Sequence, residues 1–182
     1  MFATGRWLDA GGTRAYGDWL GFAKDRYDIF NLPGVPDATI EGSWDDASSF
    51  RVTQPYDGLL SLNGLFLAKD YRIALANLFA TLRPGAMCVL DFNSIPYWYV
   101  ASDGDHSVTF NPLVIAVELQ KYLRSYVIVP IGNLVCGSAD YYARRIKSRP
   151  LMNLVHAAAA TLARLDHSPK TALDYIAVGV MR

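Results

Sequence analysis

The chain has 182 residues, which is enough for one domain with a full hydrophobic core. Its 17 basic and 17 acidic side chains balance, so it lacks the net positive charge typical of proteins that bind nucleic acid or anionic membranes. Apolar residues make up 52% of the sequence, but no apolar run reaches the ~18 residues of a membrane span. We therefore expect a globular protein with no membrane segment, for which nucleic acid is an unlikely partner.

The cysteines and histidines predict neither disulfides nor metal. Cys88 and Cys136 are too few and too far apart for a disulfide framework or a zinc site. The three histidines are scattered and have no cysteine or acidic partners at the spacing of metal ligands. We expect no metal site and a reducing, cytoplasmic compartment.

Strand-like and helix-like segments alternate along the chain. Strands are predicted at 5–10, 27–32, 38–41, 56–62, 86–92, 126–131 and 174–181. Helices are predicted at 17–24, 70–82, 112–123 and 138–165, the last with a break at Arg149-Pro150. This alternation predicts an α/β fold with a largely parallel sheet, in a single domain that spans residues 1–182.

Two of these helices have clear signals. The helix at 70–82 has Asp70 as its predicted N-cap, and Arg83-Pro84-Gly85 is predicted to end it in a turn before the next strand. In the last helix, one face gathers the apolar residues Leu151, Leu154, Val155, Ala158, Leu162 and Leu165.

The most informative segment joins the first strand to the first helix. Leu8-Asp9-Ala10-Gly11-Gly12 ends a short apolar run with an acid and then two glycines. Glycine lets the backbone pass close to a ligand, so this turn is typical of a nucleotide-like binding site. The simpler interpretation is an ordinary strand-to-helix turn, in which Asp9 is a strand-end residue.

With two further segments, the chain resembles the class I methyltransferases that use S-adenosylmethionine. Residues 8–12 resemble the family's first motif, and Tyr56-Asp57-Gly58-Leu59-Leu60-Ser61-Leu62-Asn63-Gly64-Leu65 resembles its fourth-strand motif. Residues 74–86, which contain the Leu82-Arg83-Pro84-Gly85 turn, resemble the segment before strand five and are the most distinctive. The resemblance implies a Rossmann-like three-layer sandwich whose seven-stranded sheet has the order 3-2-1-4-5-7-6, with only the last strand antiparallel.

The resemblance also implies a cofactor site for S-adenosylmethionine. Strands one and four flank the crevice where the strand order reverses. The implied contacts are Asp9, Gly11 and Gly12 for the methionine part, Asn31 for the ribose, Trp44 and Asp45 for the adenine, and Ser61 and Asn63 for the methyl-donor side. For Trp44 and Asp45, a solvated loop is the alternative, and Asp57 is predicted to structure the start of strand four.

The first motif departs from the family pattern of an acid followed by three alternating glycines. Thr13 and Ala15 replace the second and third glycines, and Asn31 stands where the family has an acid. A β-branched residue resists positive φ, so we expect Thr13 to hold its backbone away from a ligand and Gly12 to take over. These departures favour, as an alternative, a domain that keeps the fold but has lost the cofactor.

The leading hypothesis is methyl transfer from S-adenosylmethionine to a small-molecule acceptor. The catalytic residue is unknown; His106, in an aromatic loop with Tyr97 to Tyr99, is a weak candidate for a general base, with a surface histidine as the alternative. The other hypothesis is an inactive methyltransferase-like domain that serves as a structural or regulatory subunit. Strand one begins near residue 5, so we expect the family's N-terminal lid helices to be absent, and a protein partner or a homodimer to cover the site.

Overall fold

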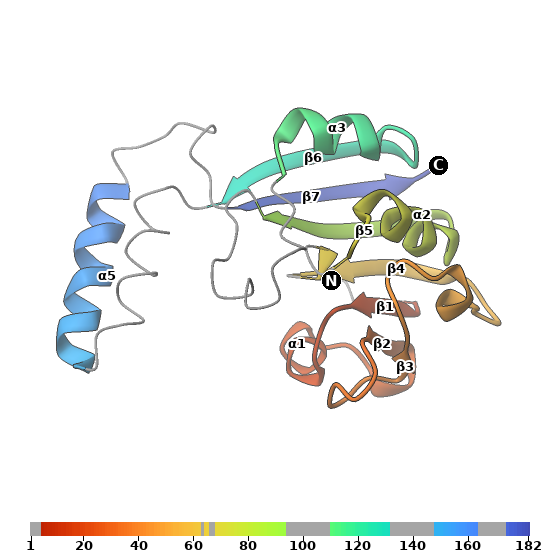
Figure 1. Ribbon diagram of the computed structural model, residues 1–182, viewed down its shortest axis with the longest axis horizontal. Coiled ribbons are helices and arrows are strands. Elements are labelled where there is room, and N and C mark those ends of the chain that lie inside the picture. Colours follow the sequence, from red (N-terminus) through yellow and green to blue (C-terminus); the bar gives the residue numbers. More distant parts are fainter. Residues whose placement is uncertain (1–4, 63, 66–67, 94–109, 132–147, 164–173) are drawn as a thin grey trace.

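The computed structural model describes residues 5–62, 64–65, 68–93, 110–131, 148–163 and 174–182 (Figure 1). The strands are β1 (Trp7–Ala10), β2 (Tyr27–Asn31), β3 (Ile40–Glu41), β4 (Tyr56–Ser61), β5 (Leu82–Asn93), β6 (Leu123–Ile131) and β7 (Asp174–Met181). The helices are α1 (Arg14–Leu20), α2 (Tyr71–Ala80), α3 (Pro112–Leu119) and α5 (Arg149–Ala163), with short 3₁₀ helices at Lys24–Arg26 and Ala47–Phe50.

The seven strands form one sheet in the order β3-β2-β1-β4-β5-β7-β6. The neighbours from β3 to β5 pair in parallel, and β7 runs antiparallel to both β5 and β6. This confirms the predicted fold class and strand order. The strand order reverses between β1 and β4. In α/β sheets, ligands usually bind beyond the carboxyl ends of the strands at such a point.

The segment around Arg83-Pro84-Gly85 differs from its prediction. Helix α2 ends at Ala80, and β5 already begins at Leu82 instead of at residue 86. Tyr56 of β4 pairs with Leu82, but Gly58 pairs with Met87, so the residues between bulge out of the ladder. Gly85 adopts a φ of 81° within this bulge. The predicted helix stop is therefore wrong: Thr81 is the C-cap of α2, and Arg83-Pro84-Gly85 forms part of β5.

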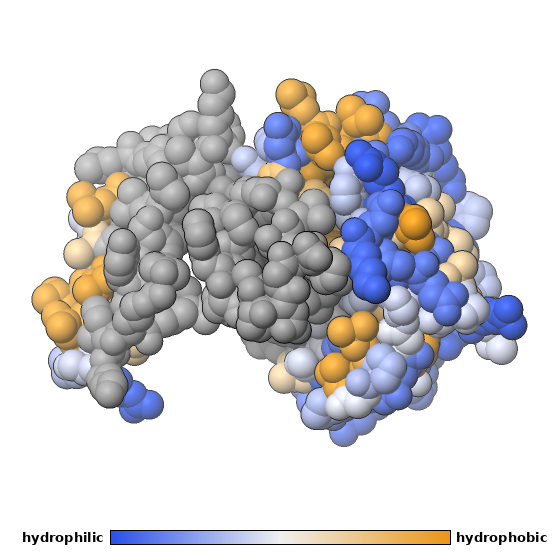
Figure 2. Space-filling model, viewed as in Figure 1, coloured by the Kyte–Doolittle hydropathy of each residue, from blue (hydrophilic) through white to orange (hydrophobic). Residues whose placement is uncertain are grey.

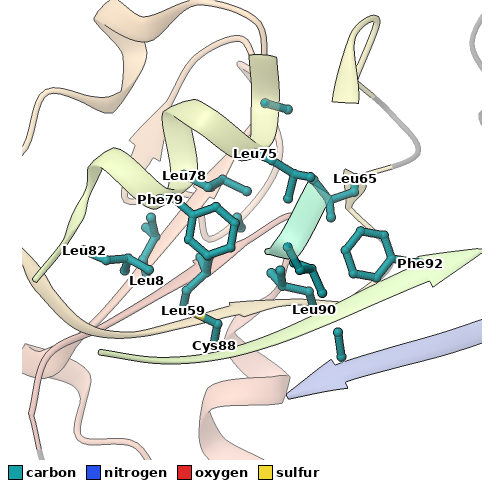
Figure 3. Close-up of a cluster of buried hydrophobic side chains, with 14 of the residues drawn as sticks. Leu8, Leu59, Leu65, Leu75, Leu78, Phe79, Leu82, Cys88, Leu90 and Phe92 are labelled. Carbon is teal, nitrogen blue, oxygen red and sulfur yellow. The ribbon is translucent and has the colours of Figure 1, made fainter. Parts of the chain in front are cut away.

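The main core lies between the sheet and helix α2 (Figure 3). Asp70 caps this helix by accepting a hydrogen bond from the Arg72 N–H at 2.8 Å, as the sequence predicts. The helix directs its apolar side onto inward-facing side chains of β1, β4 and β5, and the labelled residues include Leu8, Leu59, Leu75, Leu78, Phe79, Cys88 and Leu90. Burial raises the pKa of the free Cys88 thiol to about 12, so this cysteine is an unreactive core residue.

The amino end of β4 is held by ion pairs. Asp57 accepts a hydrogen bond from the Arg6 N–H at 2.6 Å and pairs with Arg83, and these contacts hold the pKa of its carboxyl group below the ordinary value. Arg6 also reaches Asp28 at 2.6 Å. Asp57 therefore joins the starts of β1, β4 and β5, which is the structural role that the sequence predicts.

Helix α5 lies apart from the sheet in Figure 1 and leaves much of its apolar face in solvent. Leu151, Leu154 and Leu162 are exposed. Figure 2 shows hydrophobic surface at the left of the molecule, where Figure 1 places α5. The predicted amphipathic helix is present, but these leucines are not part of the core. Among the described helices, none has both the length and the apolar character that crossing a bilayer requires.

Candidate functional site

The loop after β1 turns on Gly11. This residue has a φ of 86°, which L side chains rarely adopt, and its N–H donates to the carbonyl oxygen of Phe30 at 2.8 Å. Thr13 has an extended backbone with a φ of −134°, and its side chain is exposed. The left-handed position therefore falls on Gly11, so the loop closes without strain at Thr13 and without the expected shift to Gly12.

At Gly12, the lack of space for a side chain, and not the backbone conformation, requires glycine. A Cβ atom built on Gly12 would lie 1.7 Å from Oδ2 and 2.0 Å from Cγ of Asp9, so the Asp9 carboxyl group fills the space of the missing side chain. The close packing of this carboxyl group over the loop makes glycine the residue that fits.

Asp9 is completely buried at the end of β1. The Tyr27 hydroxyl group donates a hydrogen bond to Oδ2 of Asp9, whereas Oδ1 of Asp9 has no hydrogen-bond partner among the described residues. Desolvation raises the pKa of Asp9 to about 7, and the Tyr27 hydrogen bond counteracts part of this effect. The site thus contains a buried carboxyl group that changes charge near neutral pH and has one oxygen left to accept a hydrogen bond.

Tyr27 is a site residue that the sequence analysis missed. Burial and then the hydrogen bond to Asp9 raise the pKa of Tyr27 well above its ordinary value, so its hydroxyl group is a neutral donor. The alternation of side chains along a strand could have indicated Tyr27. Asp9 pairs with Ile29 in the parallel ladder, and Tyr27, two residues before Ile29, lies on the same face of the sheet as Ile29 and Asp9.

Asn31 and Ser61 fasten the loop to the strands on either side. The Asn31 Nδ2 donates to the carbonyl oxygen of Gly12 at 3.3 Å, and its Oδ1 accepts from the Leu32 N–H at 2.9 Å. The Ser61 hydroxyl group donates to the carbonyl oxygen of Ala10 at 2.9 Å. Both side chains are buried, so the structure brings these two predicted residues together with Asp9, Gly11 and Gly12.

Trp44 lies between the loops that follow β1 and β4. Its side chain is only 1% exposed. A Cβ atom on Gly11 would lie 3.2 Å from Trp44 Cζ2, and one on Gly64 would lie 2.6 Å from Trp44 Cη2. The solvated-loop alternative is therefore wrong for Trp44, whose indole ring lies against both glycines.

Asp45 binds the backbone of the segment that leads into α2. Its carboxylate oxygens accept hydrogen bonds from the N–H groups of Lys69 at 3.1 Å and Asp70 at 2.8 Å. In this arrangement Asp45 joins the loop after β3 to the start of α2. Two predicted residues, Asn63 and the catalytic candidate His106, lie outside the described residues, as does the aromatic segment Tyr97 to Tyr99.

The described side chains therefore combine hydrogen-bonding capacity with close packing. Asp9 offers an acceptor, and Asn31 keeps one amide hydrogen and one lone pair beyond its two internal bonds. In the described part of the chain, no three acidic, histidine or cysteine side chains are grouped as a metal site would require. The chemistry that this edge of the sheet offers is recognition of amino, hydroxyl and apolar groups.

Comparisons with known proteins identify the fold. No protein-family model and no curated protein matches the chain. A S-adenosylmethionine-dependent methyltransferase from Archaeoglobus fulgidus matches with a TM-score of 0.54 and 13% identity, over 97% of this chain and 86% of that one. An N-methyltransferase from Bradyrhizobium japonicum, in complex with S-adenosylhomocysteine, matches with a TM-score of 0.50 and 13% identity, over 99% and 79%.

A third match is a phosphoethanolamine N-methyltransferase from Haemonchus contortus, solved with phosphomonomethylethanolamine and S-adenosylhomocysteine. Its TM-score is 0.59 at 11% identity, and this chain aligns over its full length with 50% of that protein. Identities this low establish a likeness of fold alone. Together with the strand order, they show that the chain has the fold of the class I S-adenosylmethionine-dependent methyltransferases.

Proposed function

We propose that the chain binds S-adenosylmethionine at the carboxyl ends of β1, β2 and β4 and transfers its methyl group to a small-molecule acceptor. The observation that carries this proposal is the buried Asp9 carboxyl group, whose Oδ1 lacks a partner, beside the left-handed turn at Gly11. A buried polar atom without a partner is costly, so its retention at the switch point of the sheet supports a ligand there.

The residues on the β1 and β2 side fit the polar part of this cofactor. Asp9 would accept a hydrogen bond from the amino group, directly or through water, and the remaining capacity of Asn31 would serve the ribose hydroxyl groups. Asn31 gives weaker bonds than the family's acid because it carries no charge. The backbone at Gly11 and Gly12 would lie against the aminoacyl chain.

When bound, S-adenosylmethionine supplies an electrophilic methyl group on a sulfonium centre. The protein's own contribution would be to align the two reactants and to exclude water, which suffices for an acceptor that is already a good nucleophile. The acceptor class is inferred from structural neighbours such as the phosphoethanolamine enzyme. His106 remains the sequence-based candidate for a base, and a protein partner or a second copy remains the expected cover of the site.

A second candidate function is a structural or regulatory domain that binds no cofactor. The specific observation in its favour is the packing on the β3 side. The Trp44 ring fills the space beside Gly11 and Gly64, and the Asp45 carboxylate is engaged by Lys69 and Asp70. Both residues that were predicted to contact adenine thus have internal contacts.

Isothermal titration calorimetry of the full chain with S-adenosylhomocysteine at pH 8 tests these alternatives. We expect a saturable heat that D9N weakens at least tenfold, because the variant loses the charged acceptor. The matched control D25N changes an exposed acid before β2 and should bind like the wild type. If millimolar ligand gives no heat with the wild-type chain, its methyl-transfer function is refuted and the cofactor-free domain is favoured.

A further inference from the structure

The Trp44 indole lies against the backbones of Gly11 and Gly64, in the loops that follow β1 and β4. A Cβ atom on Gly64 would lie 2.6 Å from Cη2 and 3.0 Å from Cζ2 of Trp44, and one on Gly11 would lie 2.8 Å from the Cα of Gly64. The two glycine backbones therefore approach each other closely, with the ring edge against both. They form a cradle of the kind that would receive a flat ring, and a flat ring of the chain itself lies in it.

Trp44 is held in this position by apolar contacts, and its polar atom is left without a partner. Its ring packs edge-on against Phe30, with 5.4 Å between the centroids. Its Nε1 is buried and makes no hydrogen bond to the part of the chain that the structure describes. A buried N–H group without an acceptor lowers the stability of the folded state, because the group has lost its hydrogen bond to water. Leaving the cradle would return the N–H group to water.

The backbone at Trp44 is anchored independently of the ring. The Asn77 Nδ2 donates to the Trp44 carbonyl oxygen at 3.0 Å, and the neighbouring Asp45 carboxylate holds the N–H groups of Lys69 and Asp70. None of these bonds involves the indole. The attachment of the loop to α2 therefore does not depend on where the indole lies.

We propose that the Trp44 indole is an internal competitor of the adenosyl group, occupying the cradle between Gly11 and Gly64 until the cofactor displaces it. This inference rests on the proposed function, since it assigns the cradle to that cofactor. The sequence analysis assigned Trp44 as a contact of the adenine ring. In this proposal the Trp44 ring instead occupies the position that the adenosyl group would take. Cofactor affinity is then set by how firmly Trp44 is seated.

The test compares the binding of S-adenosylhomocysteine to the full-length wild type, W44A and W44F by calorimetry. Removal of the competitor should tighten binding at least tenfold in W44A and less in W44F, whose ring still fills part of the cradle. The control is F50A. Phe50 belongs to the same core cluster as Trp44 and packs against the same Phe30 ring, with 4.2 Å between the ring centroids. F50A should not tighten binding, and W44F keeps the test decisive if W44A fails to fold.

Tryptophan fluorescence gives a second readout. The chain has four tryptophans, so the Trp44 signal is taken as the difference between wild type and W44F. S-adenosylhomocysteine should shift that difference emission to the red and make it more accessible to acrylamide, because the ring moves into water.

The outcomes separate the two proposals. Weaker binding by both Trp44 variants would overturn the inference and make Trp44 an adenine contact, with the proposed function intact. Equal tightening in F50A would also overturn it, since general loosening of the core would then explain the effect. Binding by W44A but not by the wild type would overturn both proposals, because the cofactor would then fail to displace the ring, and absence of binding by every protein would also overturn both.

Discussion

Replacement of Asp9 by asparagine tests the description of the carboxyl group at the end of β1. Asp9 is fully buried, and desolvation raises its pKa from 3.8 to about 7. In the unfolded chain this group loses its proton above its ordinary pKa, whereas the folded chain retains the proton up to about pH 7. Because the folded state binds more protons in this window, the contribution of Asp9 to stability falls from about pH 4 to about pH 7 and is then constant.

The magnitude follows from the gap of about three pKa units. At about 1.36 kcal/mol per unit, Asp9 lowers the free energy of unfolding by roughly 4 kcal/mol at pH 8 and by roughly 1 to 2 kcal/mol at pH 5. The D9N variant has the same shape and no titrating group. Relative to the wild type, it should therefore gain roughly 2 to 3 kcal/mol between pH 5 and pH 8.

Urea unfolding followed by circular dichroism at the two pH values measures this difference. Other titrating groups affect both proteins equally, so only the change in their difference matters. The control D25N alters an exposed acid and should follow the wild type at both pH values. If the wild type and D9N lose or gain stability in parallel, Asp9 is already ionised at pH 5 and the reasoning from burial fails.

Three further substitutions probe the loop after β1. S61A removes the buried hydroxyl group that donates to the Ala10 carbonyl oxygen and should lower the free energy of unfolding by about 1 to 2 kcal/mol in urea titrations. G12A should lower the free energy of unfolding by about 3 kcal/mol in the wild-type background but by much less in a D9A background, because the Asp9 carboxyl group fills the space that the new methyl group needs. N31D should bind S-adenosylhomocysteine about tenfold more tightly in calorimetry, because a carboxylate makes stronger bonds to ribose hydroxyl groups, although it loses the donor to Gly12.

Each of these predictions has a contradicting result. S125A, at an exposed position on β6, should change stability by less than about 0.5 kcal/mol, and an equal loss in S61A would show that its hydrogen bond contributes little. Additive costs of G12A and D9A would mean that the two residues do not collide. Weaker or unchanged binding by N31D would remove Asn31 from the ribose contacts.

The sheet could be predicted because its signals are local. Strand β7 has the bounds predicted for it, Asp174–Met181, since its apolar run is flanked by polar residues. Strand β5 begins earlier than predicted because Arg83 to Gly85 read as a turn, and only the pairing with β4 shows that they form a bulge. The strand order itself came from the resemblance of three segments, since residue patterns alone predicted only a parallel sheet.

The sequence predicted which residues lie at the candidate site better than it predicted what those residues contact. Asp9, Gly11, Gly12, Asn31 and Ser61 do meet at one edge, because the carboxyl ends of parallel strands converge there. The position of Trp44 depends on glycines that are 33 residues before it and 20 residues after it in the chain. No local pattern states whether an aromatic ring will line a crevice or fill it, since that depends on packing between distant segments.

The position of β7 in the sheet affects how the protein can form during synthesis. This strand is the last of the seven described strands to be made, yet it lies between β5 and β6, and within the described residues it is the strand that pairs with β6. As the chain emerges from the ribosome, β5 therefore exposes an open edge and β6 has no partner until residues 174–181 have left the exit tunnel. The first five strands can pair with one another before β7 is made, whereas β6 joins the described sheet through β7. Until then the open edge of β5 and the unpaired β6 are exposed to aggregation or chaperone binding in the nascent chain.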